Sequence, residues 1–123
     1  MLDVKSPTCK SRYRATQDTL EVISGKWKLL ILGVLGQRTM RFNELCRELE
    51  IYPRILSREL KDLEGHKLVK RTVLNTRPVT VEYARTAHGA TLEPLIQAVH
   101  DWGYLHYEKI VGTKRPHDLA KEE

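Results

Sequence analysis

Near Gly65, the hydrophobic period of the sequence changes from that of helices to that of strands. Before this point, two short amphipathic helical patterns at 43–49 and 53–64 are separated by a three-residue turn. After it, two alternating, β-branched segments at 68–73 and 79–85 flank turn residues and predict a hairpin. Two helices joined by so short a turn have helix-turn-helix dimensions, and the hairpin that follows them takes the place of a wing. The sequence therefore predicts a mainly α fold with a small β-hairpin wing, a winged helix-turn-helix.

Local signals predict where the helices begin and end. Asn43 is expected to cap the first helix of the pair, which puts Glu44 in the first turn, where the helix dipole favours an acid. Pro53 suits the first position of the second helix, because its missing N–H would have no helical partner there. Gly36 is expected to end the preceding helix in the left-handed conformation, and Gly65 to end the second helix of the pair.

The second helix of the pair is the expected DNA-reading element. Leu56, Leu60 and Leu63 share one face and are expected to point into the core. The opposite face carries Arg54, Ser57, Arg58 and Lys61. Arginine and serine can hydrogen-bond base edges in the major groove, and lysine can meet phosphate. The alternative is a solvated face whose cations pair with Glu59 and Asp62 of the same helix.

A formal net charge of +5 favours anionic partners, although charge alone does not identify one. Arg77 at the tip of the predicted wing is placed to reach the minor groove or the DNA backbone. Further phosphate contacts are expected from Arg41, Lys26 and Lys28. These cations complete the predicted DNA-binding set.

The rest of the chain divides into an arm, helices and a tail. Residues 1–14 are polar and are expected to form an arm without its own core, ahead of a domain at 15–111. Helical pattern begins at about Thr16, and the nearly continuous apolar run at 26–35 predicts a buried central helix. A short extended piece is expected at 40–42.

From Thr86, a suitable cap, a long helical pattern runs to about Val111, and Pro94 is expected to kink or restart it. Residues 112–123 are expected to be a polar tail.

Several classes of protein are not expected. Two cysteines are too few for a disulfide-rich secreted scaffold of 123 residues. The N-terminus lacks the apolar stretch of a signal peptide, and the longest apolar run, at 29–35, is too short to span a bilayer. We therefore expect a cytoplasmic protein with reduced thiols and no membrane partner.

Catalytic and metal-binding patterns are also missing from the sequence. It has no glycine-rich phosphate loop, nucleophile elbow or spaced carboxylate pair, so we do not expect an enzyme. The histidines form no H-x-x-x-H and accompany no C-x-x-C, so neither a metal nor another cofactor is expected. His100 and Asp101 are consecutive and are expected not to face each other.

Seven short motifs occur in an order that resembles a known family. They are GKWKLLIL at 25–32, RFNEL at 41–45, LSRELKDLE at 56–64, LVKRTV at 68–73, VEY at 81–83, T-x-x-G at 86–89 and DWG at 101–103. Together they cover about residues 9–110 and resemble the HxlR family of winged-helix regulators, relatives of the MarR family. The resemblance implies a sequence-specific, double-stranded-DNA-binding transcriptional regulator, more commonly a repressor than an activator. The alternative is a protein–protein adaptor that uses the same scaffold without DNA.

The resemblance also implies a homodimer built through terminal helices, here about 15–24 and 87–110, that addresses a palindromic operator. The residues expected at the dimer interface are Leu20, Leu92, Ile96, Val99, Trp102, Gly103, His106 and Ile110. The alternative for the stripe on the last helix is core within one chain. Two recognition helices would then lie roughly 34–36 Å apart, about one DNA turn. An effector would act by changing their angle or spacing.

Many members of this family respond to oxidants, electrophiles or small aldehydes through an N-terminal cysteine. Cys9 lies among basic residues, which lower a thiol pKa, and it is the expected redox-sensing residue; an unreactive thiol is the alternative. It lies five residues before the family's usual cysteine position, where this chain has Arg14. Cys46 is expected to be a buried structural thiol.

Two further positions depart from the family pattern. Arg85 replaces the usual leucine before the T-x-x-G motif, and its direction, towards solvent or DNA, is open. Tyr52 replaces a serine as the cap of the recognition helix, and its side chain cannot cap in the same way.

Overall fold

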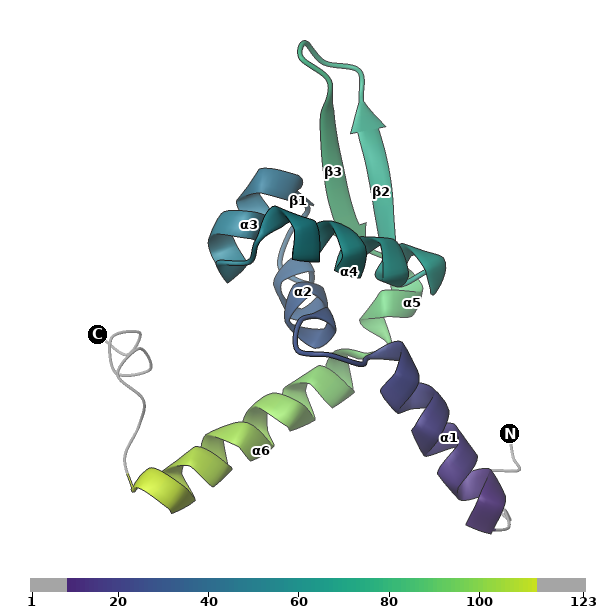
Figure 1. The fold of residues 1–123 in the computed structure, drawn as a ribbon, viewed down its shortest axis with the longest axis vertical. Helices are drawn as coiled ribbons and strands as arrows, with labels where there is room; N and C mark the ends of the chain where they lie inside the picture. Colours follow the sequence, from purple (N-terminus) through teal and green to yellow (C-terminus); the bar gives the residue numbers. More distant parts are fainter. Residues whose placement is uncertain (1–8, 113–123) are drawn as a thin grey trace. The chain divides into compact units, whose positions relative to one another are not determined.

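The computed structural model describes the backbone of residues 9–112 and the side chains of residues 12–112. It forms two compact units, Met1–Ala90 and Thr91–Glu123. In chain order the elements are α1 (Cys9–Val22), α2 (Lys28–Leu35), β1 (Met40–Arg41), α3 (Phe42–Leu49), α4 (Pro53–Gly65), β2 (Val69–Leu74), β3 (Thr80–Arg85), α5 (Ala87–Ala90) and α6 (Glu93–Val111) (Figure 1). The predicted mainly α fold with a β-hairpin is confirmed.

The three strands form one antiparallel sheet in the order β1-β3-β2. In the hairpin, the register runs from Val69 opposite Arg85 to Leu74 opposite Thr80. The segment predicted only as extended supplies the third strand, because Met40 pairs with Tyr83 of β3. This pairing attaches the base of the hairpin to the segment that leads into α3.

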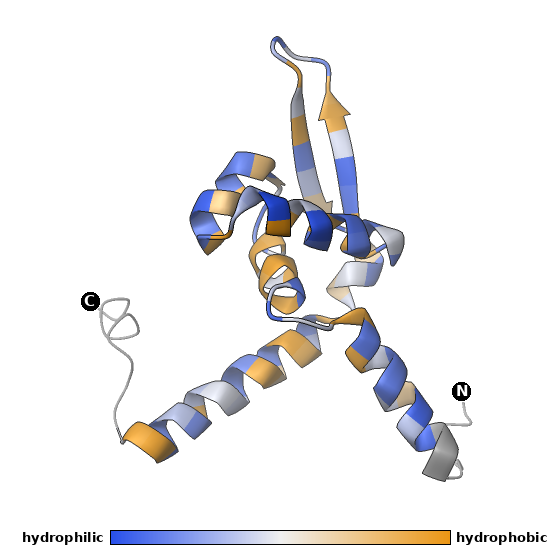
Figure 2. Ribbon diagram, viewed as in Figure 1, coloured by the Kyte–Doolittle hydropathy of each residue, from blue (hydrophilic) through white to orange (hydrophobic). Residues whose placement is uncertain are grey.

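The core of the first unit lies where α2, α3 and α4 meet the base of the sheet. Its largest fully buried side chains are Ile31, Leu32, Leu45, Leu56, Leu60 and Leu63. Figure 2 shows α2 as almost entirely hydrophobic, as expected for a central helix with apolar neighbours on most sides. The predicted inward face of α4 is therefore confirmed.

The first turn of α3 differs from the prediction, because the helix begins at Phe42 and Asn43 lies inside it. The N-cap is Arg41, whose φ of −84° and ψ of 161° are extended, since this residue still pairs with β3. The Arg41 amide donates to Glu44 Oε1 at 2.8 Å. This hydrogen bond, more than the neighbouring arginines, lowers the pKa of the Glu44 carboxyl.

The end of α2 also differs from the prediction. Gly36 has φ −68° and ψ −17°, so the expected left-handed conformation is wrong. The position instead provides space, because a Cβ on Gly36 would lie 2.5 Å from Arg85 Nη1. That atom donates to the carbonyl oxygen of Leu32 at 3.3 Å. Arg85 is therefore directed against the end of α2 and satisfies a backbone carbonyl there.

Helix α1 begins at Cys9, inside the segment assigned to a polar arm. The polar turns at 9–15 carry no hydrophobic period, so the pattern placed the start of this helix too late. The division of the chain into arm, domain and tail remains a prediction, and residues 113–123 of the tail lie outside the described residues.

The long C-terminal helical pattern is interrupted as Pro94 indicated. Thr86 caps α5, with the Gly89 amide donating to Thr86 Oγ1 at 2.9 Å. A new helix, α6, then starts at Glu93 with Pro94 in its first turn. It ends at Gly112, whose φ of 85° is left-handed. None of the residues of α6 is buried.

Candidate nucleic-acid interface

The turn between α3 and α4 is compact and well supported by backbone contacts. Glu50 adopts the left-handed conformation, with φ 52° and ψ 50°, and reverses the chain. Ile51 is buried, and its amide donates to the carbonyl of Cys46 at 3.1 Å. Pro53 takes the first helical position, as predicted, while Tyr52 makes no side-chain cap and is 77% exposed. The helix-turn-helix spacing read from the sequence is thus present in the structure.

The outer face of α4 is polar, basic and open. Its side chains predicted to meet DNA are all exposed, namely Arg54, Ser57, Arg58 and Lys61. Among the side chains at 12–112, none of these three cations takes part in an ion pair. Three positive groups are therefore available to an anionic partner along one helix face.

Lys28 has a different environment from the one predicted. Its side chain is 7% exposed, and its Nζ lies 2.5 Å from Glu59 Oε1 and 3.4 Å from Asp62 Oδ2. The same nitrogen is 3.5 Å from the carbonyl oxygen of Ser24. This corrects the expectation that Lys28 contacts phosphate, because the side chain is buried and already paired. It also shows that Glu59 and Asp62 pair with Lys28 rather than with the cations of α4.

The other predicted phosphate contacts are on the surface. Lys26 is exposed, with its Nζ 4.7 Å from the centroid of the Trp27 ring, and Arg41 is exposed at the start of α3. Arg77 is exposed in the loop between β2 and β3. In that loop, Thr76 Oγ1 donates to the carbonyl of Pro78 at 2.8 Å, which helps to close the turn.

The sequence reasoning did not assign a role to Lys70 and Arg71, which are also exposed on β2. Their adjacency on a strand was the available signal, because consecutive strand residues point to opposite faces. The wing therefore offers cations on both faces as well as at its tip.

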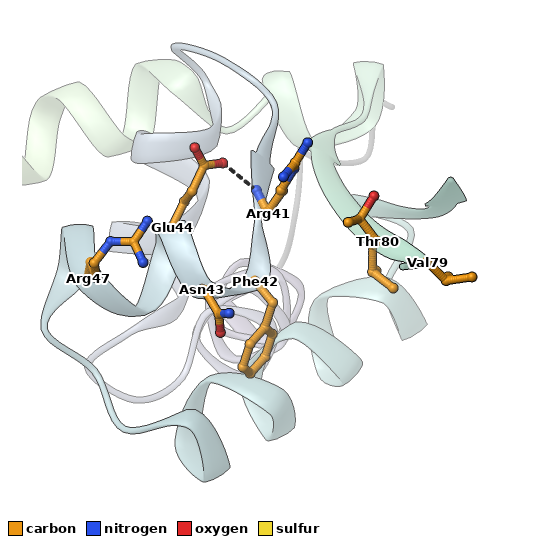
Figure 3. A pocket seen from close by; sticks show the side chains of 8 residues that line it. Arg41, Phe42, Asn43, Glu44, Arg47, Val79 and Thr80 are labelled. Carbon is orange, nitrogen blue, oxygen red and sulfur yellow. Dashed lines mark hydrogen bonds between the residues drawn. The ribbon is translucent and has the colours of Figure 1, made fainter. Parts of the chain in front are cut away.

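A cavity of about 460 Å³ lies between the first turns of α3 and the start of β3 (Figure 3). Its polar lining includes Arg41, Asn43 and Arg47 of the helix side and Thr80 of the strand side. Glu44 also lines the cavity, and its Oε2 atom lies 3.6 Å from Arg38 Nη1. Arg47 was missed by the sequence analysis, although it stands one helical turn after Asn43, on the same face.

Helix α6, taken by itself, presents a large apolar and aromatic surface. Val99, Trp102, Leu105 and Ile110 are between 49% and 70% exposed. Of these, Leu105 was not among the predicted interface residues. The Trp102 and His106 rings stack, with centroids 4.6 Å apart and an interplanar angle of 12°. Leu20 of α1, another predicted interface residue, is 59% exposed. Exposed apolar area of this kind is typical of an interaction surface.

The prediction for His100 and Asp101 is wrong, because His100 Nδ1 lies 3.1 Å from Asp101 Oδ1. Gln97 Nε2 also donates to this carboxylate oxygen at 3.0 Å. The hydrogen bond from His100, followed by the one from Gln97, lowers the pKa of Asp101.

The structure describes the side chain of Cys46 and only the backbone of Cys9. Cys46 is a half-buried free thiol, and burial raises its pKa. This environment agrees with a structural role, since a raised pKa leaves little reactive thiolate. Cys9 is the first residue of α1, and its side chain lies outside the described residues.

The described part of the chain shows neither a membrane-spanning helix nor a cluster of metal-ligating side chains. Between residues 9 and 112, no helix has both the length and the apolar content that crossing a membrane requires. Within the same range, histidine, cysteine, aspartate and glutamate side chains do not gather in threes as a metal site would need.

The chain is similar to known transcriptional regulators in sequence and in fold. A family model described as the HxlR-like helix-turn-helix matches residues 22–111. The uncharacterised HTH-type transcriptional regulator YdzF of Bacillus subtilis (strain 168) is 39% identical over 97 residues, covering 77% of this chain and 89% of YdzF.

Two solved structures share the fold. The crystal structure of YtcD, an uncharacterised HTH-type transcriptional regulator of Bacillus subtilis, has a TM-score of 0.72 and 36% identity, covering 76% of this chain and 96% of that one. The redox regulator HypR in its reduced form has a TM-score of 0.74 and 34% identity, covering 80% of this chain and 99% of that one.

Proposed function

The chain belongs to the HxlR family of helix-turn-helix transcriptional regulators, and on that basis we propose that it acts as a homodimer that binds a specific double-stranded DNA operator. The observation that carries this proposal is the outer face of α4. Arg54, Ser57 and Arg58 are exposed there on a helix whose opposite face is held in the core. A rigid helix with an unpaired basic face suits insertion into the major groove.

The exposed polar and basic side chains fall into two groups by expected role. Arg54, Ser57 and Arg58 read base edges, because their side chains project from the first half of α4. Lys61, Lys26, Arg41 and Arg77 contact phosphates and fix the position of the helix on the duplex. The cavity beside Arg41 adds Arg47 and Asn43 as candidate phosphate contacts. Contacts of the second kind give affinity without sequence preference.

The homodimer is supported by the exposed apolar residues of α6 and by Leu20 of α1. The interface residues are the predicted Leu20, Leu92, Ile96, Val99, Trp102, Gly103, His106 and Ile110, with Leu105 added. Covering these side chains removes apolar area from water, which drives association. Two-fold symmetry of the dimer then matches a palindromic operator.

We further propose that oxidants regulate DNA binding through Cys9. This proposal rests on the basic neighbourhood of Cys9 in the sequence and on the likeness to HypR, a redox regulator. Oxidation of Cys9 would alter the pairing of the two chains and hence the spacing of the α4 helices. We propose that DNA binding by this protein represses transcription. We also propose that the protein has no catalytic role.

The test is selection of duplexes from a random library, followed by titration of the reduced protein against the selected duplex and a scrambled duplex of the same length. A DNA-binding regulator binds the selected duplex at least about a thousandfold more tightly than the scrambled one. Equal binding of both duplexes would contradict sequence specificity. Binding of neither would favour the alternative function, a protein–protein adaptor.

A further inference from the structure

The recognition helix carries no net formal charge of its own. Arg54, Arg58 and Lys61 are balanced by Glu59, Asp62 and Glu64 within Pro53–Gly65. An acid on a helix that enters the groove of a polyanion opposes the attraction that the cations of the helix supply, the more so the closer it lies to the duplex. A contact that holds an exposed acid of α4 away from the duplex would therefore favour DNA binding.

A buried lysine lies beside two of these acids. Lys28 of α2 lies against α4, and its Nζ contacts the carboxylates of both Glu59 and Asp62. Its side chain is 7% exposed, and that of Glu59 is 11% exposed, so solvent screens their interaction little. Two of the three acids of α4 therefore share one buried positive charge.

The position of Asp62 makes this charge relevant to the DNA face. Asp62 stands one helical turn after Arg58, so the two side chains lie on neighbouring parts of the helix surface. The Asp62 side chain remains 55% exposed and, without the contact to Lys28, could turn towards the same duplex as Arg58. The contact with Lys28 draws its carboxylate towards the α2 side of the helix.

We propose that Lys28 is the counter-ion of the recognition helix α4: Glu59 and Asp62 share its one positive charge, and its contact with Asp62 holds that carboxylate away from DNA and thereby leaves Arg58 and Lys61 free to bind. It is a positioning residue that touches no part of the DNA. This inference rests on the proposed function, since it concerns how α4 meets a duplex. It differs from a phosphate contact because Lys28 acts through Asp62.

A double-mutant cycle in the full-length protein separates these roles. The buried pair is first replaced by apolar side chains in Lys28→Met/Glu59→Leu, a kind of exchange that commonly preserves folding. We expect this variant to bind the selected duplex about tenfold more weakly than wild type: the formal charge is unchanged, but Asp62 loses the contact that draws its carboxylate towards α2 and away from the duplex. Adding Asp62→Asn should restore the affinity to within about twofold, whereas Asp62→Asn alone in wild type should change it by less than about twofold.

The salt dependence provides a second readout. The slope of log affinity against log salt should be the same for wild type and Lys28→Met/Glu59→Leu, because no phosphate contact is lost. The control is Lys26→Met, two residues away and exposed, which should lower the slope by about one. Circular dichroism at the assay temperature verifies folding, and Lys28→Gln/Glu59→Gln replaces the apolar pair if that variant unfolds.

Each other outcome overturns the inference in a different way. An equal gain from Asp62→Asn in both backgrounds would show that Lys28 does not shield this carboxylate. A slope lowered by about one in the variant lacking Lys28, without rescue, would show that Lys28 meets phosphate. Failure of wild type itself to bind any selected duplex would instead remove the proposed function, and this inference with it.

Discussion

The Nζ atom of Lys28 lies 2.5 Å from the Oε1 atom of Glu59, and this pair joins α2 to α4 across 31 residues of sequence. Both side chains are buried. A buried ion pair carries a desolvation cost. Removing one partner alone destabilises the fold more than replacing both partners with apolar side chains, because it leaves the other charge buried without its partner. Removal of one partner of the pair therefore has measurable consequences for stability.

Glu59→Ala should lower the free energy of unfolding by about 3 kcal/mol, because it leaves the Lys28 ammonium buried with only the more distant Asp62 carboxylate and the Ser24 carbonyl as partners. Urea unfolding followed by circular dichroism measures this change. Lys28→Met/Glu59→Leu should be close to wild type in the same experiment. A double variant that is as unstable as Glu59→Ala would show that the pair itself stabilises the fold.

Arg58→Ala should weaken binding to the selected duplex by about 1–3 kcal/mol and relax the preference at one base-pair position, as expected for a base contact. The comparison is Lys61→Ala, which should weaken binding to selected and scrambled duplexes alike. Affinities for a set of single-base operator variants distinguish the two patterns. If Arg58→Ala weakens all duplexes equally, Arg58 contacts only phosphate.

Ile110→Asp should convert the proposed homodimer to monomer, because it places a charge in the proposed apolar contact; Ile110 is 70% exposed in the single chain. Sedimentation equilibrium over a range of protein concentrations measures the shift. Lys109→Ala, a substitution at the neighbouring exposed position, should leave the dimer intact. A dimer that survives Ile110→Asp would exclude this part of α6 from the interface.

Glu44 should make the stability of the fold depend on pH. The hydrogen bond from the Arg41 amide lowers the pKa of the folded-state carboxyl, so the stabilisation is present above the unfolded-state pKa and is lost as the pH falls through the lower folded-state pKa. Glu44→Gln should remove this contribution and flatten the curve of unfolding free energy in the acid range. Curves of equal slope for both proteins would show that the carboxylate does not stabilise α3.

Mild oxidation should weaken operator binding by wild type and by Cys46→Ser but not by Cys9→Ser. The raised pKa of the half-buried Cys46 leaves this thiol little reactive thiolate. Titrations before and after treatment with diamide, and again after reduction, measure the effect. A Cys9→Ser protein that still loses binding on oxidation would exclude Cys9 as the sensor.

The sequence predicted the elements whose signals are local. Pro53 marked the start of α4, Leu56, Leu60 and Leu63 marked its buried face, and Pro94 marked the restart that became α6. The alternating residues of the hairpin likewise predicted two strands. In each case the spacing or backbone chemistry of neighbouring residues is enough to decide the conformation.

What the sequence missed depends on contacts between distant segments. Lys28 resembled any other exposed lysine beside Trp27, because nothing local indicates that Glu59 will lie next to it. Similarly, strand pairing moved the start of α3 ahead of Asn43, and Arg85 took up the space at Gly36. Arg47 joined the cavity only because β3 returns beside α3.

The most direct test of DNA recognition by α4 is the affinity of wild type and Arg54→Ala/Arg58→Ala for the selected and scrambled duplexes across a range of salt concentrations. For wild type we predict a steep fall in affinity with salt and a strong preference for the selected duplex. For the double variant we predict that most of the preference is lost while binding to the scrambled duplex persists. An unchanged preference in the double variant would contradict the account, because the sequence would then be read by another part of the protein.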